Sequence, residues 1–198
     1  MINQIVKYIE TGIIDEEKIN SFIDEMIHIS KDDLVGLIKY CDIRSIDATN
    51  IPQYSTYEDG TYNMLQYLRM SGDFGPRYAE IGSHYLDNNQ NKDALVKYGE
   101  NHSKLASLLG LVRIKKCGRV SRVYLSELGK RIERMENQEQ IIMISRLSVG
   151  IPIIGHCIKH DVYTVDQLYG ILLEYLTEVT ATRRRKNTWD ILRLFREG

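Results

Sequence analysis

The chain has 198 residues, of which 43% are hydrophobic and 27% are charged, and it contains only three prolines. This composition is typical of one or two compact domains and excludes a Pro-rich linker protein. No apolar run reaches the ~18 residues of a membrane-spanning helix, and a mixed amphipathic stretch follows Met1, so we expect neither a membrane span nor a signal segment. The three cysteines, Cys41, Cys117 and Cys157, form no Cys-x-x-Cys pair, which favours reduced thiols and a cytoplasmic protein.

The formal net charge of −1 hides a division along the chain. Residues 1–90 carry 7 Lys and Arg against 15 Asp and Glu, a charge of −8, whereas residues 91–198 carry 19 against 12, a charge of +7. Basic residues that gather in one part of a chain favour contact with the phosphates of a nucleic acid. Uneven charge also occurs in proteins that bind no nucleic acid, so this feature needs support from motifs.

The acidic residues 1–45 are predicted to form three short helices. An apolar stripe that ends near Gly12 marks the first helix, Asp15 is expected to cap the second, and Ser30 is expected to cap the third. This segment could be a helical cap, a homodimerisation arm or the contact region for a protein partner. It could also simply pack against the next domain.

Residues 46–60 are polar and rich in turn-forming residues, so we place a domain boundary there. A helix is expected over residues 61–70, and another over residues 76–86, because Pro76 suits the first position of a helix. Residues 87–91 are predicted to form a turn before a third helix. Three helices with a polar turn before the third are typical of a helix-turn-helix.

The third predicted helix, residues 91–109, is followed by two alternating runs. Residues 111–117 and 119–125 each alternate apolar and polar side chains, and Gly118 between them allows a turn, so they predict a β-hairpin. A helix followed directly by a basic hairpin is how a winged helix-turn-helix ends. In that arrangement the helix enters the DNA major groove and the hairpin lies on the backbone.

Two segments carry a resemblance to a known family. The runs YGENHSKLASLLGLV (residues 98–112) and VYLSELGK (residues 123–130) resemble the recognition helix and second wing strand of winged-helix domains attached to restriction-modification and other bacterial defence proteins. The resemblance covers residues 60–130 and, more weakly, the C-terminal third. It implies a DNA-reading component of a restriction or defence system, or a transcriptional regulator.

DNA contacts are expected from both the third helix and the hairpin. The suitable helix residues are Asn91, Lys92, Lys97, Asn101 and Lys104, with Tyr98 and His102 on the same helix. The suitable hairpin residues are Arg113, Lys115, Lys116 at the turn, Arg119 and Arg122. Lysine and arginine hold phosphates, whereas asparagine can pair with adenine. The alternative is an exposed hairpin that its charge keeps from aggregating.

After the hairpin the pattern becomes helical again. A helix is expected from about Ser126, and another through residues 141–147, which Gly150 and Pro152 end or kink. Residues 151–158 are strongly apolar and are expected to be buried.

A second helix-turn-helix is predicted near the end of the chain. Thr164 is expected to cap a helix, residues 177–180 to form a tight turn, and residues 181–195 to form a final helix. The start of that helix holds a polar and basic cluster, namely Thr182, Arg183, Arg184, Arg185, Lys186 and Asn187. We expect this cluster to bind phosphates, and a solvated helix face is the alternative. No second hairpin follows, which departs from the winged-helix pattern.

The sequence shows no motif for catalysis. Residues 16–18 contain two glutamates and a lysine, but they lie at a predicted helix start and not on a strand. His156 and His160 have a spacing that could hold a metal, although apolar neighbours favour a structural pair. No phosphate-binding glycine loop is present. We therefore expect no catalytic residue, no metal and no cofactor.

These features together predict a mainly α protein with a small β-hairpin, arranged as tandem winged-helix or helix-turn-helix units behind an N-terminal helical segment. The expected domains are residues 1–50, a winged helix-turn-helix at 55–130 and a second helix-turn-helix-like domain at 131–198. The expected function is sequence-recognising binding of double-stranded DNA. The alternative is a protein-interaction module of a multi-subunit complex, with residues 1–45 as the contact or homodimer surface, and a nuclease with an unrecognised site is a third reading.

Overall fold

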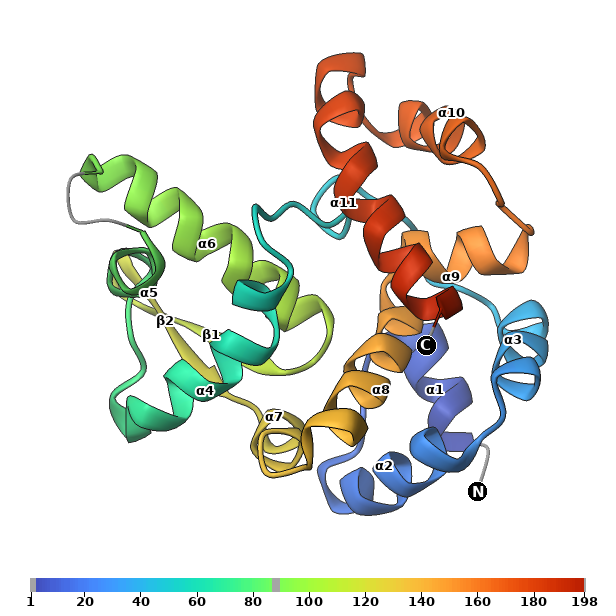
Figure 1. Cartoon of the computed structure of the whole chain (residues 1–198), viewed down its shortest axis with the longest axis horizontal. Helices are drawn as coiled ribbons and strands as arrows, with labels where there is room; N and C mark the ends of the chain where they lie inside the picture. The colour runs from blue at the N-terminus through green and yellow to red at the C-terminus, as the bar shows by residue number, and fades with distance from the viewer. Residues whose placement is uncertain (1–2, 87–89, 198) are drawn as a thin grey trace. The chain divides into compact units, whose positions relative to one another are not determined.

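The computed structural model describes residues 3–86 and 90–197 of the chain (Figure 1). Within these ranges it is mainly helical and contains one two-stranded antiparallel sheet, which confirms the predicted mainly α class with a small hairpin. The chain forms two compact units. Unit 1 combines residues 1–52 with residues 136–198, and unit 2 comprises residues 53–135.

Unit 1 is built from helices at both ends of the chain. Its N-terminal elements are α1 (Asn3–Thr11), the 3-10 turn η1 (Glu16–Lys18), α2 (Ile19–His28) and α3 (Lys31–Tyr40). Its C-terminal elements are α8 (Asn137–Leu147), the 3-10 turn η4 (Ser148–Gly150), α9 (Pro152–Lys159), α10 (Val165–Tyr175) and α11 (Glu178–Glu197). Helix α2 packs against α8, α3 against α9, and α1 against η4. The acidic N-terminal segment therefore shares a core with the last third of the chain.

The core of unit 1 follows from apolar side chains at helical spacing. Phe22 and Met26 lie four residues apart on α2, Leu34 and Ile38 lie four apart on α3, and all four are fully buried. Each such side chain contributes about 1.5–3 kcal/mol of hydrophobic stabilisation. Residues 151–158 are buried as predicted, apart from the half-exposed His156.

Half-buried cations connect the two ends of the chain by binding carbonyl oxygens. Arg146 of α8 donates to the carbonyl groups of Ile27 and Ile29, at 3.0 and 2.8 Å, where α2 ends. Lys159 of α9 donates to the carbonyl of Cys41 at 2.7 Å, just after α3. The last carbonyls of a helix have no partner within it, so a nearby cation stabilises them. Burial lowers the pKa of Arg146, whose partners here are neutral carbonyls.

Several helix starts are capped by a side chain, and Ser30 and Thr164 were predicted to act in this way. The side chains of Ser30, Ser126 and Thr164 each accept a hydrogen bond from the backbone N–H three residues further on. This satisfies one of the free N–H groups of the first turn. Asp15 stands before η1 but makes no such side-chain bond, and it pairs with Lys7 at 2.5 Å instead.

The predicted tight turn at residues 177–180 is wrong, because α11 already begins at Glu178. The backbone N–H of Ala181 donates to the carbonyl of Thr177 at 2.8 Å, which is the hydrogen bond of a helical turn. A glutamate in the first turn also suits the positive end of the helix dipole. The basic cluster at residues 183–186 consequently lies beyond the first turn of α11.

Unit 2 places helices against a small sheet (Figure 1). Its elements are the 3-10 turn η2 (Glu58–Gly60), α4 (Tyr62–Met70), the 3-10 turn η3 (Gly72–Phe74), α5 (Tyr78–Tyr85), α6 (Lys92–Leu108), β1 (Val112–Cys117), β2 (Val120–Leu125) and α7 (Glu127–Ile132). Helix α4 packs against β2, and α6 packs against β1. The turn predicted at residues 87–91 includes residues 87–89, which lie outside the described residues.

The start of α5 differs from the prediction, because the helix begins at Tyr78 and not at Pro76. The carbonyl of Pro76 accepts a hydrogen bond from the N–H of Val123 at 3.0 Å, and Arg77 pairs with Arg122 in an antiparallel bridge. Pairing with β2 holds this segment extended, so the helix starts only after it. Residue 77 thus forms an isolated bridge with β2 and does not add a third strand to the sheet.

The hairpin has the predicted strands and turn. Strand β1 pairs with β2 in antiparallel register, from Val112 opposite Leu125 to Cys117 opposite Val120. The turn contains Gly118, whose φ of +64° suits glycine. Lys116 belongs to β1 and not to the turn, where it was predicted.

Helices α5 and α6 cross in direct backbone contact. A Cβ atom added to Gly82 would lie 2.0 Å from the carbonyl oxygen of Leu95, and one added to Gly99 would lie 2.0 Å from the carbonyl oxygen of Tyr78. The contacting residues lie four apart on each helix, so the backbones meet at two successive turns. Only glycine fits at both positions, since any side chain would push the helices apart.

Among the described residues, no single helix is long and apolar enough to cross a membrane. Helix α8 with η4, taken together with α9, meets the length and composition criteria only as a pair, and this pair is bent by 84°.

The helix crossing leads to a stability prediction. Gly82→Ala should destabilise the protein by about 1–3 kcal/mol, because the added methyl group overlaps a backbone carbonyl. Gly170→Ala is the matched control, since a Cβ atom there meets nothing within 4 Å, and it should stabilise the protein by about 0.5–1 kcal/mol. Urea unfolding followed by circular dichroism measures both changes. A Gly82→Ala variant as stable as the wild type would contradict the close crossing.

Candidate nucleic-acid interface

Helix α6 exposes lysines along one side and begins with a capped turn. The side chain of Asn91 accepts a hydrogen bond from the N–H of Ala94 at 2.8 Å, so this predicted base-contacting residue is engaged as the N-cap. Lys97 and Lys104 are exposed, and both contact Glu100, at 3.4 and 2.6 Å. The hydrogen bond from Lys104, together with the charge of Lys97, lowers the pKa of Glu100. This side of α6 therefore carries lysines whose charge is partly compensated.

The other side of α6 turns aromatic groups inward. His102 is fully buried, and its Nε2 accepts hydrogen bonds from the N–H groups of Ser55 and Thr56, at 3.3 and 3.2 Å. The hydroxyl group of Tyr98 donates to Asp59 at 2.7 Å. Both side chains therefore hold residues 55–59 against the helix. They were expected to face solvent, and they do not. Asn101 lies half-buried between the two sides.

The hairpin is rich in cations and contains no acidic residue. Residues 112–125 include three arginines and two lysines, and no aspartate or glutamate. Lys115 lies directly opposite Arg122 in the register, and like charges at such positions destabilise a sheet. Lys115 also lies over the ring of Tyr124, 5.3 Å from its centre. Arg113, Lys115, Lys116 and Arg119 are exposed.

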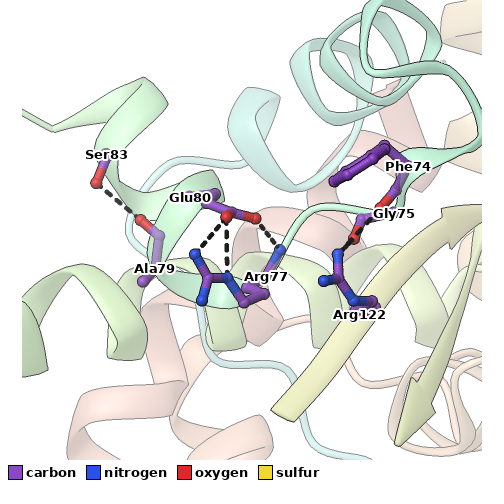
Figure 2. A network of polar contacts seen from close by, with 7 residues as sticks. All are labelled: Phe74, Gly75, Arg77, Ala79, Glu80, Ser83 and Arg122. Carbon is purple, nitrogen blue, oxygen red and sulfur yellow. Dashed lines mark hydrogen bonds and ion pairs between the residues drawn. The ribbon is translucent and has the colours of Figure 1, made fainter. Parts of the chain in front are cut away.

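Arg122 differs from the other hairpin cations, because it is half-buried and bound to the protein's own backbone. Its guanidinium group donates to the carbonyl oxygens of Phe74 and Gly75, at 3.1 and 2.9 Å, and lies over the Phe74 ring (Figure 2). The ring of Tyr124 covers Gly75 and leaves no room for a side chain there. The φ of +48° at Gly75 also suits glycine. Arg122 therefore anchors the segment that leads into α5.

Arg77 is a basic residue that the sequence analysis missed. Its side chain bonds to Glu80 at 2.6 and 2.9 Å, while the other carboxylate oxygen of Glu80 accepts from the Arg77 backbone N–H (Figure 2). These bonds lower the pKa of Glu80 and hold the first turn of α5. The alternation of residues 119–125 was visible in the sequence, but nothing local revealed that Arg77 would form a bridge with Arg122.

A cleft of roughly 550 Å³ brings the start of α6 and the tip of the hairpin together. Its cationic lining residues are Arg77, Lys92 and Arg119, and Glu100 is the acidic one. Val96 of α6 and Val120 of β2 also line it. The structure therefore gathers at one cleft two predicted DNA-contacting residues from separate elements, Lys92 and Arg119.

The basic cluster on α11 is mostly engaged within unit 1. Arg184 is half-buried and donates to the carbonyl oxygens of Ala48 and of Ile51, the latter at 3.0 Å. Arg185 lies over the ring of Tyr169, 5.2 Å from its centre. Lys186 pairs with Asp190 at 2.5 Å. Of the other members, Thr182 and Arg183 are exposed and Asn187 is half-buried.

Within residues 3–86 and 90–197, no group of three His, Cys, Asp or Glu side chains could hold a metal ion. His156 and His160 have ring centres 4.3 Å apart. Burial, and then the neighbouring His160, lowers the pKa of His156.

No family model, curated protein or solved structure matches the chain.

The position of Arg184 can be tested by a change that keeps its charge. Arg184→Lys should destabilise the protein by about 1–2 kcal/mol, because a lysine cannot reproduce two carbonyl bonds from one planar group. Lys186→Ala on the same helix should change stability by less than about 0.5 kcal/mol, since its ion pair is exposed. Urea unfolding distinguishes the two. Equal changes in stability for the two variants would show that Arg184 does not hold α11 to the carbonyl groups of Ala48 and Ile51.

The buried His102 should make stability depend on pH. Burial lowers its pKa below the ordinary value of 6.5, so the unfolded chain binds a proton more readily than the folded one. The stabilisation is complete above that ordinary value and is lost as the pH falls toward the lower, folded-state pKa. His102→Gln should reduce the difference in unfolding free energy between about pH 7.5 and about pH 5.5. An unchanged difference would mean that His102 does not titrate in this way.

Proposed function

We propose that unit 2 is a winged-helix domain that binds double-stranded DNA. The order of its elements supports this: α4, an isolated β-bridge at Arg77, α5, α6 and then the β1–β2 hairpin. A winged helix uses such an order to set a recognition helix beside a hairpin that contacts the DNA backbone. Unit 2 also carries 13 Lys and Arg against 9 Asp and Glu, a formal charge of +4.

The observation that carries the proposal is the cleft shared by the start of α6 and the tip of the hairpin. Lys92 and Arg119 line it from the two elements that a winged helix applies to DNA. The composition of the hairpin supports the same conclusion, because it holds five cations and no acidic residue, and Lys115 lies directly opposite Arg122, where an anion would reduce the repulsion.

Each part of this surface has a distinct role in the proposal. Lys92, Lys116 and Arg119 bind phosphates, and the positive end of the α6 dipole favours an anion at its start. Lys97 and Lys104 contact phosphates along the DNA major groove. These contacts would release Glu100 from its ion pairs with the two lysines. A free glutamate can then accept a hydrogen bond from the amino group of cytosine. Arg122 acts indirectly by holding the segment before α5.

Unit 1 contributes less to this function than the sequence indicates. Arg184 and Arg185 are engaged within unit 1, so the exposed Arg183 and Lys186 are the cations of this cluster that could add phosphate contacts. The proposal therefore rests on unit 2. The sequence resemblance implies a restriction or defence system, or transcriptional regulation, as the setting for such a domain.

Protein binding is the second candidate function, and the ion pairs on α6 favour it. Glu100 contacts both Lys97 and Lys104, so much of the exposed side of α6 is already neutralised. A surface with paired charges suits a protein partner better than a phosphate backbone. Independence of DNA affinity from salt would favour this candidate.

A DNA titration tests the proposed surface. Lys92→Ala with Arg119→Ala should weaken binding to a duplex, because each variant removes a phosphate contact. The slope of log affinity against log salt concentration should fall by about 1 for each contact removed. Fluorescence anisotropy at several salt concentrations measures both quantities.

Lys130→Ala is the matched control for charge. Lys130 is exposed on α7 and pairs with Glu127 at 2.6 Å, away from the cleft-lining residues. This variant should bind DNA as the wild type does. If the double variant and the control bind equally, the cleft is not the DNA surface, and if the wild type binds no duplex, the proposed function fails.

A further inference from the structure

Unit 1 contains a groove between α2 and α3 that none of the proposed DNA contacts uses. Its volume is roughly 620 Å³. Apolar side chains line it, including Ile5 of α1, Ile29 just after α2 and Leu37 of α3. Tyr40 stands at its end with 91% of its surface exposed, which is unusual for so large a side chain.

The edges of this groove are acidic. Four carboxylate residues line it, namely Asp24, Glu25, Asp32 and Asp33. Among the described lining residues there is no lysine or arginine, and His28 is the only basic side chain. The groove therefore combines an apolar base with a rim of one charge sign, which suits a partner with apolar and cationic side chains.

Glu25 adds a second sign that a cationic group is expected here. Its Oε2 atom is buried and has no hydrogen-bond partner among the described residues. A buried carboxylate oxygen without a partner is costly, so the half-buried Glu25 side chain would gain a bond by turning toward an incoming lysine or arginine.

A glycine also lines the groove. Gly36 lies in the interior of α3, where glycine costs stability relative to alanine. At Gly82 and Gly99 a carbonyl group 2.0 Å from the Cβ position explains the glycine, but a Cβ atom on Gly36 would meet nothing within 4 Å. No contact among the described residues requires this glycine. It does leave the groove open for close approach of another chain.

We propose that this groove binds a basic amphipathic helix of another protein, with its apolar face on Ile5, Ile29 and Leu37 and its cations on the carboxylates. A helix in a groove places apolar side chains at every third or fourth position, and the flanking lysines reach the rim. Binding at this groove is independent of DNA binding by unit 2.

The test uses a defined probe with the full chain. The probe is a fluorescein-labelled helix of about 18 residues composed of leucine and lysine in amphipathic order, and its control is the same composition in scrambled order. Wild-type protein should bind the amphipathic probe at least tenfold more tightly than the scrambled one. Equal binding of the two would overturn the proposal, because it would show charge attraction alone.

Substitutions locate the binding. Gly36→Leu fills the groove and should weaken probe binding at least tenfold, whereas Gly170→Leu should not, since Gly170 is also an open helix position but lies outside the groove. Asp24→Asn with Asp32→Asn should weaken binding and reduce its salt dependence. Glu136→Gln with Glu139→Gln, an equal change of charge on exposed sites of unit 1, should not.

Two further results would overturn the proposal. One is probe binding that Gly36→Leu leaves unchanged. The other is a wild-type dimer in sedimentation that Gly36→Leu dissociates, because the occupant would then be a second copy of this chain. Gly36→Leu should bind duplex DNA as the wild type does, which separates this outcome from that of the DNA proposal.

Discussion

The direct contact between the backbones of α5 and α6 is the constraint on which the arrangement of unit 2 depends. Because Gly82 and Gly99 each meet a carbonyl group of the other helix, α6 cannot rotate about its axis without a clash. This fixes which side of α6 is buried, with His102 inward and Lys97 outward. The same crossing sets Gly99, in the middle of α6, beside Tyr78 at the start of α5, and Arg77 joins α5 to the sheet.

The cations of this protein divide into two groups that a charge count does not distinguish. The first group donates hydrogen bonds to backbone carbonyl oxygens and consists of Arg122, Arg146 and Arg184. A planar guanidinium group with five N–H bonds can satisfy several such acceptors at once. Lys92 and Arg119 instead line an open cleft. A net charge therefore overestimates the surface available to phosphates, and the proposed DNA interface is confined to one face of unit 2.

Local patterns were sufficient to predict the hairpin and several helix starts. Alternation around Gly118 predicted the strands, and Ser30 and Thr164 were recognised as caps because capping acts within three residues. The shared core of residues 1–52 and 136–198 was not predictable in this way, because packing between distant segments leaves no local pattern. The role of Arg184 was missed for the same reason, since its acceptors, the carbonyls of Ala48 and Ile51, are far away in the sequence.

The central claim is that the hairpin tip and the start of α6 form one DNA-binding face, and Cys117 provides a direct measurement of it. Cys117 is exposed near the tip, whereas Cys41 and Cys157 are buried, so a thiol reagent should modify Cys117 selectively. The account predicts that saturating duplex DNA slows alkylation of Cys117 several-fold. An unchanged rate at a DNA concentration that saturates binding would contradict it.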